Sequence, residues 1–183
     1  MTRSIRLILA LACAAVTAAS LALPAGAGPQ APSVPGTIAV EDGHKVFLVG
    51  HAVGDQIYSC NAVGDGYAWG FVGPRADLFD DRGKLIATHF GGPTWQARDG
   101  SWVKAQRVDG VKVDAGAIDW LLLKVSSQSA GSDGDRLVAT TFIQRINTVG
   151  GIAPAAAGCN ADTVGTIVPV AYEADYYFWK AAA

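Results

Sequence analysis

The fold is decided by the segment VPVAYEADYYF, residues 168–178, in which side-chain character alternates with a period of two. One set of alternate residues is entirely apolar or aromatic: Val168, Val170, Tyr172, Ala174, Tyr176 and Phe178. The other set includes Glu173, Asp175 and Tyr177. Successive side chains of a β-strand point to opposite faces of the sheet, so this pattern predicts a strand with one face in the core.

Turn signals divide the preceding chain into further strands. Asp81-Arg82-Gly83 predicts a hairpin between 76–79 and 84–89, and Ser132-Asp133-Gly134 predicts another between 120–125 and 137–147. Residues 137–144 are apolar on both faces, which favours a central strand. Asp99-Gly100 and Asp109-Gly110 indicate two more reversals. Ala115–Leu122 is compatible with a short helix or with a buried strand.

The fold class is therefore expected to be all-β and mainly antiparallel, as a single-domain sandwich or a small barrel. The expected domain covers residues 38–180. Residues 28–37 contain Pro29, Pro32 and Pro35 and are expected to form an extended leader.

Residues 1–27 have the features of a Sec-type signal peptide. Arg3 and Arg6 precede an apolar run from Leu7 to Leu23, and Ala25-Gly26-Ala27 provides a small-residue cleavage pattern. We expect cleavage after Ala27 and a secreted or periplasmic protein. The remaining chain has 12 basic and 16 acidic residues, with no basic cluster and no apolar run long enough for a membrane span. These features argue against nucleic-acid binding and against a membrane span in the mature chain.

Cys60 and Cys159 are the two cysteines that remain after cleavage. Two cysteines in an oxidising compartment predict one disulfide, the alternative being a buried pair of free thiols. The bridge would close a loop of about 100 residues, for which the loop-entropy model gives about 4.7 kcal/mol of stabilisation.

Several strings together resemble the uncharacterised secreted family of bacteria and fungi known as domain-of-unknown-function family 3455. They are GDQIYSC (54–60), GPTW (92–95), DGS (99–101), DAGAI (114–118), QRINT (144–148) and ADYYF (174–178). The resemblance implies a Cys60–Cys159 disulfide and implies no activity. Some relatives carry a malate dehydrogenase label, but Gly64, Gly66 and Gly70 lack the spacing of a dinucleotide-binding turn. The biochemical function is therefore unknown at this point, and no cofactor is predicted.

The aromatic residues suggest a binding site. Trp95 and Trp102 flank a polar turn beside a Gly-Pro loop, which predicts a face for an apolar small molecule or a carbohydrate. The alternative is that these rings fill the core. The predicted ligand-binding residues are His89, Trp95, Asp99, Ser101, Trp102 and Asp114.

Two classes of function follow. The preferred one is a non-catalytic ligand-binding or surface-interaction module that uses the predicted face. The alternative is an extracellular hydrolase in which Asp114, Asp119 or His89 supplies acid–base groups, and a cleft joining His89, Asp99 and Asp114 would favour it. Asp114 has a structural alternative as the cap of a turn. The histidines His44, His51 and His89 lack the spacing of a zinc site, so no metal is predicted.

Overall fold

The computed structural model describes residues 28–182. In this part of the chain eight β-strands and two short 3₁₀ turns are present, and there is no α-helix. The 3₁₀ turns are η1 (Gly36–Ile38) and η2 (Ala156–Gly158). The strands are β1 (His44–Val63), β2 (Gly66–Phe79), β3 (Leu85–Phe90), β4 (Thr94–Ala97), β5 (Trp102–Val111), β6 (Trp120–Ser129), β7 (Phe142–Gly150) and β8 (Ile167–Ala181). The predicted signal peptide lies outside the described residues.

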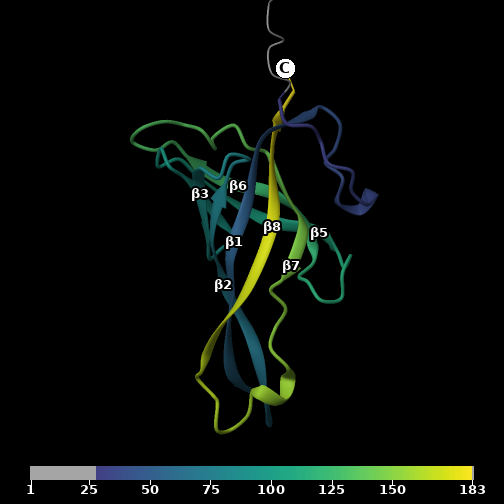
Figure 1. Ribbon diagram of the computed structural model, residues 1–183, viewed down its shortest axis with the longest axis vertical. Helices are drawn as coiled ribbons and strands as arrows, with labels where there is room; N and C mark the ends of the chain where they lie inside the picture. Colours follow the sequence, from purple (N-terminus) through teal and green to yellow (C-terminus); the bar gives the residue numbers. More distant parts are fainter. Residues whose placement is uncertain (1–27, 183) are drawn as a thin grey trace, which may run out of the picture.

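The eight strands form one closed barrel. Each strand pairs antiparallel with its neighbours in chain order, and β8 returns to pair with β1. The fold is thus the barrel rather than the sandwich of the two predicted architectures, and closure leaves no free edge in the strand order. Figure 1 shows β1 and β8 side by side along the length of the molecule.

The two ends of the barrel receive different connections, because consecutive turns of an up-and-down barrel alternate between its ends. The mouth end is the end that carries the β1–β2, β3–β4, β5–β6 and β7–β8 connections. The opposite end carries the β2–β3, β4–β5 and β6–β7 connections. Residues 66–75 of β2 pair only with β1, so β1, β2 and β8 continue beyond the barrel at the mouth end as a three-stranded extension (Figure 1).

Alternation along the strands fills the barrel interior. In β8 the predicted inward face is confirmed, because Tyr172, Ala174, Tyr176 and Phe178 are buried. They pack with Leu78, Trp95 and other inward residues of the remaining strands in one core cluster. A second cluster lies where Ile38 and Val34 pack near Trp179 and Phe142, and Gln144 there donates to the Ile38 carbonyl at 2.6 Å. The predicted leader thus contributes Val34 to this second cluster.

Three predicted turns were confirmed, whereas one predicted turn and the start of one predicted strand were wrong. Asp81-Arg82-Gly83 connects β2 to β3, Asp99-Gly100 connects β4 to β5, and Ser132-Asp133-Gly134 lies in the connection from β6 to β7. Residues 137–141 are not strand, because Thr140 Oγ1 and its N–H both donate to the Leu137 carbonyl and close a turn. Asp109-Gly110 is not a reversal, since β5 continues through it with a register shift between Arg107 and Asp109.

Candidate functional site

A cavity of about 150 Å³ lies at the mouth end of the barrel interior. Its wall is mostly aromatic and aliphatic and comes from all eight strands and the β3–β4 turn. The lining residues are Gln56, Phe71, Val72, Gly73, Pro74, His89, Gly92, Pro93, Trp95, Arg107, Leu121, Leu123, Arg145 and Tyr176. A register shift between Ile57 and Tyr58 of β1 leaves Val72 of β2 without an opposing partner. Such bulges re-aim side chains and are frequent beside functional sites.

Three aromatic rings in this wall are almost fully buried. His89 and Trp95 are cross-strand partners in β3 and β4, and their rings stack with centroids 4.1 Å apart and planes 7° apart. Tyr176 meets both rings edge-on, at 5.1 Å from His89 and 5.4 Å from Trp95. The direct pairing of β3 with β4 therefore builds a flat, rigid aromatic surface.

His89 is neutral in this environment. Burial lowers the pKa of its imidazole to about 3, because the charged form would lose its hydration. Nδ1 lies 2.9 Å from the Thr94 carbonyl, which can only accept, so Nδ1 carries the proton. Nε2 is then an acceptor with no hydrogen bond among the described residues. The side chain offers a hydrogen-bond acceptor and no charge.

Two buried hydrogen-bond donors in the cavity wall have no partner among residues 28–182. They are Nε2 of Gln56 and Nε1 of Trp95, whose residues are 2% and 0% exposed. A buried donor without a partner costs about 1–3 kcal/mol, so such groups are rare away from functional sites. Burial is the main cause that raises the pKa of the Tyr172 phenol, the neighbouring Tyr176 raises it further, and the nearby Gln56 amide lowers it. The contact between Gln56 and Tyr172 does not meet the distance and angle limits of a hydrogen bond, so Gln56 Nε2 stays without a partner.

The β7–β8 connection holds Gln56 in place. The hydroxyl of Tyr58, two residues along β1, donates to the Gly151 carbonyl at 2.8 Å. Gly151 has a positive φ of 78°, and a Cβ there would lie 3.0 Å from Gln56 Cγ and 2.8 Å from Tyr172 Cβ. Glycine is therefore required both by the backbone conformation and by the close approach.

A wider hollow of about 440 Å³ adjoins the cavity and shares Gln56, Phe71, Arg107, Leu121 and Arg145 with it. We call this hollow the mouth. Its other lining residues are Tyr58, Lys112, Ile118, Asp119, Ile152 and Ala153. The cavity and the mouth together run from a buried aromatic wall to a polar opening.

Charged side chains surround the mouth. Asp119 pairs with Lys112 at 3.2 Å and with Arg107 at 3.6 Å, and all three side chains are partly exposed. The Nε and Nη2 atoms of Arg145 donate to the main-chain carbonyl of Asp119 at 3.1 and 2.8 Å. Arg145 is also the cross-strand partner of Leu121 and Tyr176, so its strand position directs it toward the barrel interior.

The structure brings only some of the predicted site residues together. His89 and Trp95 lie in the cavity wall. Asp114 lies in the β5–β6 connection at the same end, but it is exposed and its carboxylate accepts from the Gly116 N–H at 2.7 Å. This geometry is that of the turn-capping alternative.

Asp99, Ser101 and Trp102 lie elsewhere. Asp99 and Ser101 belong to the β4–β5 turn at the opposite end of the barrel. Trp102 pairs with the exposed Gln96 and with Ser129, while its neighbour Val103 pairs with the buried Trp95. Trp102 is thus on the outer face of the sheet and Trp95 on the inner face. The two tryptophans do not share one surface.

Asp99 instead organises the opposite end. One carboxylate oxygen accepts from the Ser101 hydroxyl at 2.6 Å and from its N–H at 3.0 Å, and the other accepts from the Arg136 N–H at 2.9 Å. These bonds, that of the Ser101 hydroxyl first, lower the pKa of the Asp99 carboxyl. Ser101 Oγ in turn accepts from the Leu137 N–H at 3.2 Å. Asp99 therefore clips the β4–β5 turn to the β6–β7 connection.

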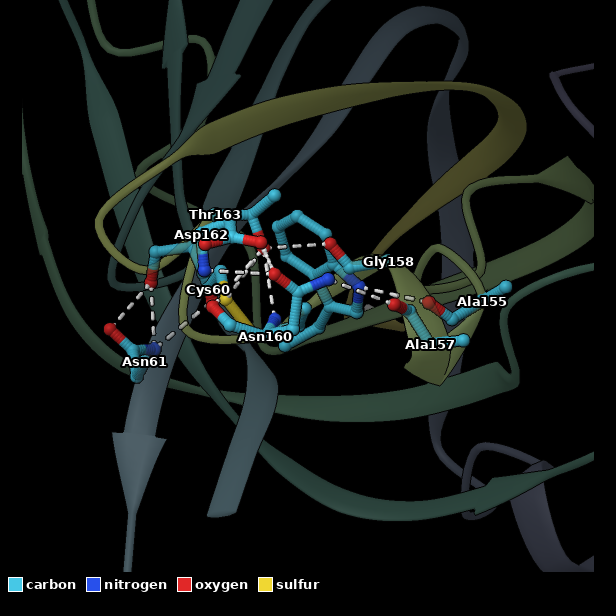
Figure 2. The surroundings of a disulfide bond; sticks show 11 residues. Cys60, Asn61, Ala155, Ala157, Gly158, Asn160, Asp162 and Thr163 are labelled. Carbon is cyan, nitrogen blue, oxygen red and sulfur yellow. Dashed lines mark hydrogen bonds between the residues drawn. A yellow bond between two sulfur atoms is a disulfide. The ribbon is translucent and has the colours of Figure 1, made fainter.

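The predicted disulfide is confirmed. Cys60 in the extension and Cys159 after η2 are joined, with Cα atoms 5.3 Å apart. Figure 2 shows the bond beside Thr163, whose hydroxyl donates to the Gly158 carbonyl at 2.9 Å. Nε1 of Trp69 also donates to the Ala155 carbonyl at 3.2 Å. The bond thus fastens the β7–β8 connection, which supplies Ile152 and Ala153 to the mouth, to the β1–β2 hairpin.

The sequence predictions missed four important residues, Gln56, Arg107, Arg145 and Tyr176. Arg145 did leave a signal, because it stands in a strand that is apolar on both faces and follows Ile143 on the inward face. Gln56 is likewise a polar residue among inward-facing positions, since it lies two residues before Tyr58 on the buried side of β1. A polar residue at a strand position whose alternate neighbours are apolar can be recognised from the sequence alone.

Two further findings concern the described part of the chain. Across residues 28–182, no cluster of three or more His, Cys, Asp or Glu side chains is arranged to hold a metal ion. No helix within these residues is both long and apolar enough to cross a membrane.

Comparison with known proteins identifies the family. The model of the family described as "Protein of unknown function (DUF3455)" matches residues 41–180, which is most of the chain. The chain therefore belongs to this family. No curated protein and no solved structure matches it.

Proposed function

We propose that this DUF3455 member is an exported ligand-binding barrel whose mouth-end cavity takes a small ring-containing molecule. The observation that carries the proposal is the presence of two buried donors without partners, Gln56 Nε2 and Trp95 Nε1, in the wall of one apolar cavity. A ligand with a hydrogen-bond acceptor would satisfy them, and its ring would pack on the aromatic surface.

The size of the cavity supports a single ring. Its volume is about 150 Å³, and an apolar cavity of about this size in another protein admits benzene. The ligand class is thus smaller and flatter than an oligosaccharide, and the proposed site is the barrel interior rather than the outer face near Trp102.

Export is supported by two features. Residues 3–27 have the pattern of a signal peptide, and the Cys60–Cys159 disulfide fits an oxidising compartment. Peptide mass fingerprinting of the protein recovered from outside the cytoplasm would test this part, with Gly28 as the expected first residue. Recovery from the cytoplasm with residues 1–27 retained would refute it.

The hydrolase alternative has less support. His89 is a neutral acceptor in the cavity, Asp99 is at the opposite end of the barrel, and Asp114 caps a turn. No hydrogen bond or ion pair connects these three side chains among the described residues. The convergence that would favour acid–base catalysis is therefore lacking.

The binding proposal is tested by NMR on ¹⁵N-labelled protein, using the indole N–H signals of its five tryptophans. Phenol, acetophenone and benzamide are the probes, and glucose and cellobiose represent carbohydrates. We expect an aromatic probe to shift the Trp95 signal selectively, since its N–H gains an acceptor.

Trp95→Phe, which keeps a ring and loses the donor, should weaken binding of that probe. Trp102→Phe is the matched control on the outer face and should leave it unchanged. Equal effects of the two variants, or a shift confined to Trp102, would contradict an interior site.

A further inference from the structure

The mouth carries an excess of positive charge. Three cationic side chains line it, Arg107, Lys112 and Arg145, whereas Asp119 is the one acidic residue among its described lining residues. The whole chain has the opposite balance, with a formal charge of −2. A local concentration of cations on an acidic protein attracts anionic ligands to that place.

Arg107 and Arg145 both line the cavity as well as the mouth, and of the two Arg145 makes no ion pair with Asp119. The main-chain carbonyl of Asp119 accepts from Nε and Nη2, which fixes the plane of the guanidinium. No hydrogen bond from Nη1 to a described residue meets the distance and angle limits, but the guanidinium lies close to the Tyr176 phenol, whose pKa burial raises and Arg145 lowers. A guanidinium held in this way keeps part of its donor fork available, and a carboxylate is the anion whose planar geometry matches it.

We propose, building on the ligand-binding function above, that the ligand is an aromatic carboxylate bound with its ring inward. The ring lies against Trp95 and Tyr176 in the cavity, where an acceptor atom on the ring would meet the unpartnered donors, and the carboxylate lies in the mouth against Arg145 and Arg107. This orientation follows from solvation, since a carboxylate is costly to bury without a partner and the cations are at the opening.

Asp119 is the competitor for these cations. Its carboxylate occupies Arg107 and Lys112 in the ligand-free protein. Arg145, by contrast, is held by the main-chain carbonyl of Asp119, so Asp119→Asn removes the competing charge and keeps the acceptor that orients Arg145. This variant separates the electrostatic effect from loss of structure.

The experiment is titration calorimetry on the disulfide-bonded protein with two matched pairs of ligands. These are benzoate with benzamide and 3-phenylpropanoate with 3-phenylpropanamide, which differ in charge and hardly in shape. We expect one carboxylate to bind about tenfold or more tightly than its amide, as for one charge-assisted hydrogen-bonded pair. The advantage should shrink as salt is added.

Three variants sharpen the result. Arg107→Gln should weaken the carboxylate and leave the amide unchanged, while Asp119→Asn should strengthen the carboxylate about threefold or more. Arg75→Gln is the control, because Arg75 is an exposed cation that pairs with Asp55 on β1 and does not line the mouth. It should alter neither ligand.

The outcomes distinguish this inference from the proposed function. Amides that bind as tightly as their carboxylates would overturn the carboxylate inference and leave a ring-binding barrel. Absence of binding by all four ligands and by the neutral probes named above would overturn both. A loss of amide and carboxylate binding in equal measure in Arg107→Gln would assign Arg107 a structural role and contradict the inference.

Discussion

The two ends of the barrel handle buried polar groups in opposite ways. At the opposite end, Asp99 and Ser101 form a chain of hydrogen bonds to Arg136 and Leu137, and each of these four residues contributes a donor or acceptor with a partner. At the mouth end, Gln56 and Trp95 present donors that find no partner among residues 28–182. Both ends draw on strands of the same sheet.

This difference separates polar groups that hold the fold from polar groups that are open to a ligand. A buried hydrogen-bond network in which every group has a partner stabilises the protein and leaves no donor or acceptor free for a ligand. Unsatisfied donors cost stability and persist where another role maintains them. The sequence shows polar residues beside tryptophans at both ends. Only the hydrogen bonds of the folded protein show which of these polar groups have partners and which do not.

The largest expected effect concerns the Cys60–Cys159 disulfide at the mouth end. Replacing Cys60 and Cys159 together by serine opens a loop of about 100 residues, for which the entropy model predicts a loss of about 4.7 kcal/mol in the free energy of unfolding. For a chain of this size the thermal midpoint should fall by about 10–20 °C, measured by calorimetry. Reduction of the wild-type disulfide should give a similar fall, and an unchanged midpoint would show that the bond does not stabilise the fold.

The clip at the opposite end gives the next largest effect. Asp99→Ala removes the acceptor of three hydrogen bonds and should cost about 2–3 kcal/mol in the free energy of unfolding, measured by urea denaturation. Asp114→Ala is the control, because its exposed carboxylate makes a single bond to Gly116, and it should cost less than about 1 kcal/mol.

The Asp99 clip also has a pH signature. Since its folded-state pKa is lowered, its stabilisation is present above the unfolded-state pKa and is lost as the pH falls through the folded-state value. The difference between wild type and Asp99→Ala should therefore narrow in acid. Equal costs for Asp99→Ala and Asp114→Ala at neutral pH would contradict the assignment of a structural clip to Asp99.

Strand content could be predicted from the sequence because alternation and turn chemistry are local. The buried face of β8 and the turn at Asp81-Arg82-Gly83 depend on neighbouring residues only, and both were confirmed. The prediction of a strand over residues 137–141 was wrong, because Thr140 donates a hydrogen bond to the Leu137 carbonyl and forms a turn inside an apolar run. Apolar character shows burial, and here burial occurred without strand pairing.

The site could be predicted only in part. His89 and Trp95 were predicted as site residues because they stand close to the Gly-Pro loop in the sequence, whereas the pairing of Arg145 with Tyr176 depends on the register of β7 against β8. The same register decides that Trp102 faces outward. Which residues share a cavity is a long-range property, set by barrel closure and strand stagger.

A smaller effect tests the unsatisfied donors themselves. Gln56→Met replaces the amide by an apolar side chain of similar length, which removes the buried donor that has no partner. We expect the free energy of unfolding to stay constant or to rise by about 1 kcal/mol, while affinity for a cavity ligand falls. A clear loss of stability would show that the Gln56 amide is a structural group, like Asp99, and would remove the contrast between the two ends.

The smallest effect is expected on the outer surface near the opposite end. His51 lies between two carboxylates, with Nδ1 2.6 Å from Asp175 and Nε2 2.8 Å from Asp81. Both partners only accept, so both ring nitrogens must carry protons and the imidazole is cationic when both bonds are made. The bond to Asp81 is the main cause that raises the pKa of His51, with burial opposing it and Asp175 assisting.

A raised folded-state pKa fixes the direction of the pH effect. The stabilisation by His51 is fully present below its unfolded-state pKa, which is near 6.5, and is lost as the pH rises through the folded-state value. The thermal midpoint of wild type should exceed that of His51→Gln by a small margin at about pH 5.5 and by less at about pH 8.5. A margin that grows with pH would mean that neutral His51 is the stabilising form, and the two-carboxylate arrangement would then not hold a cation.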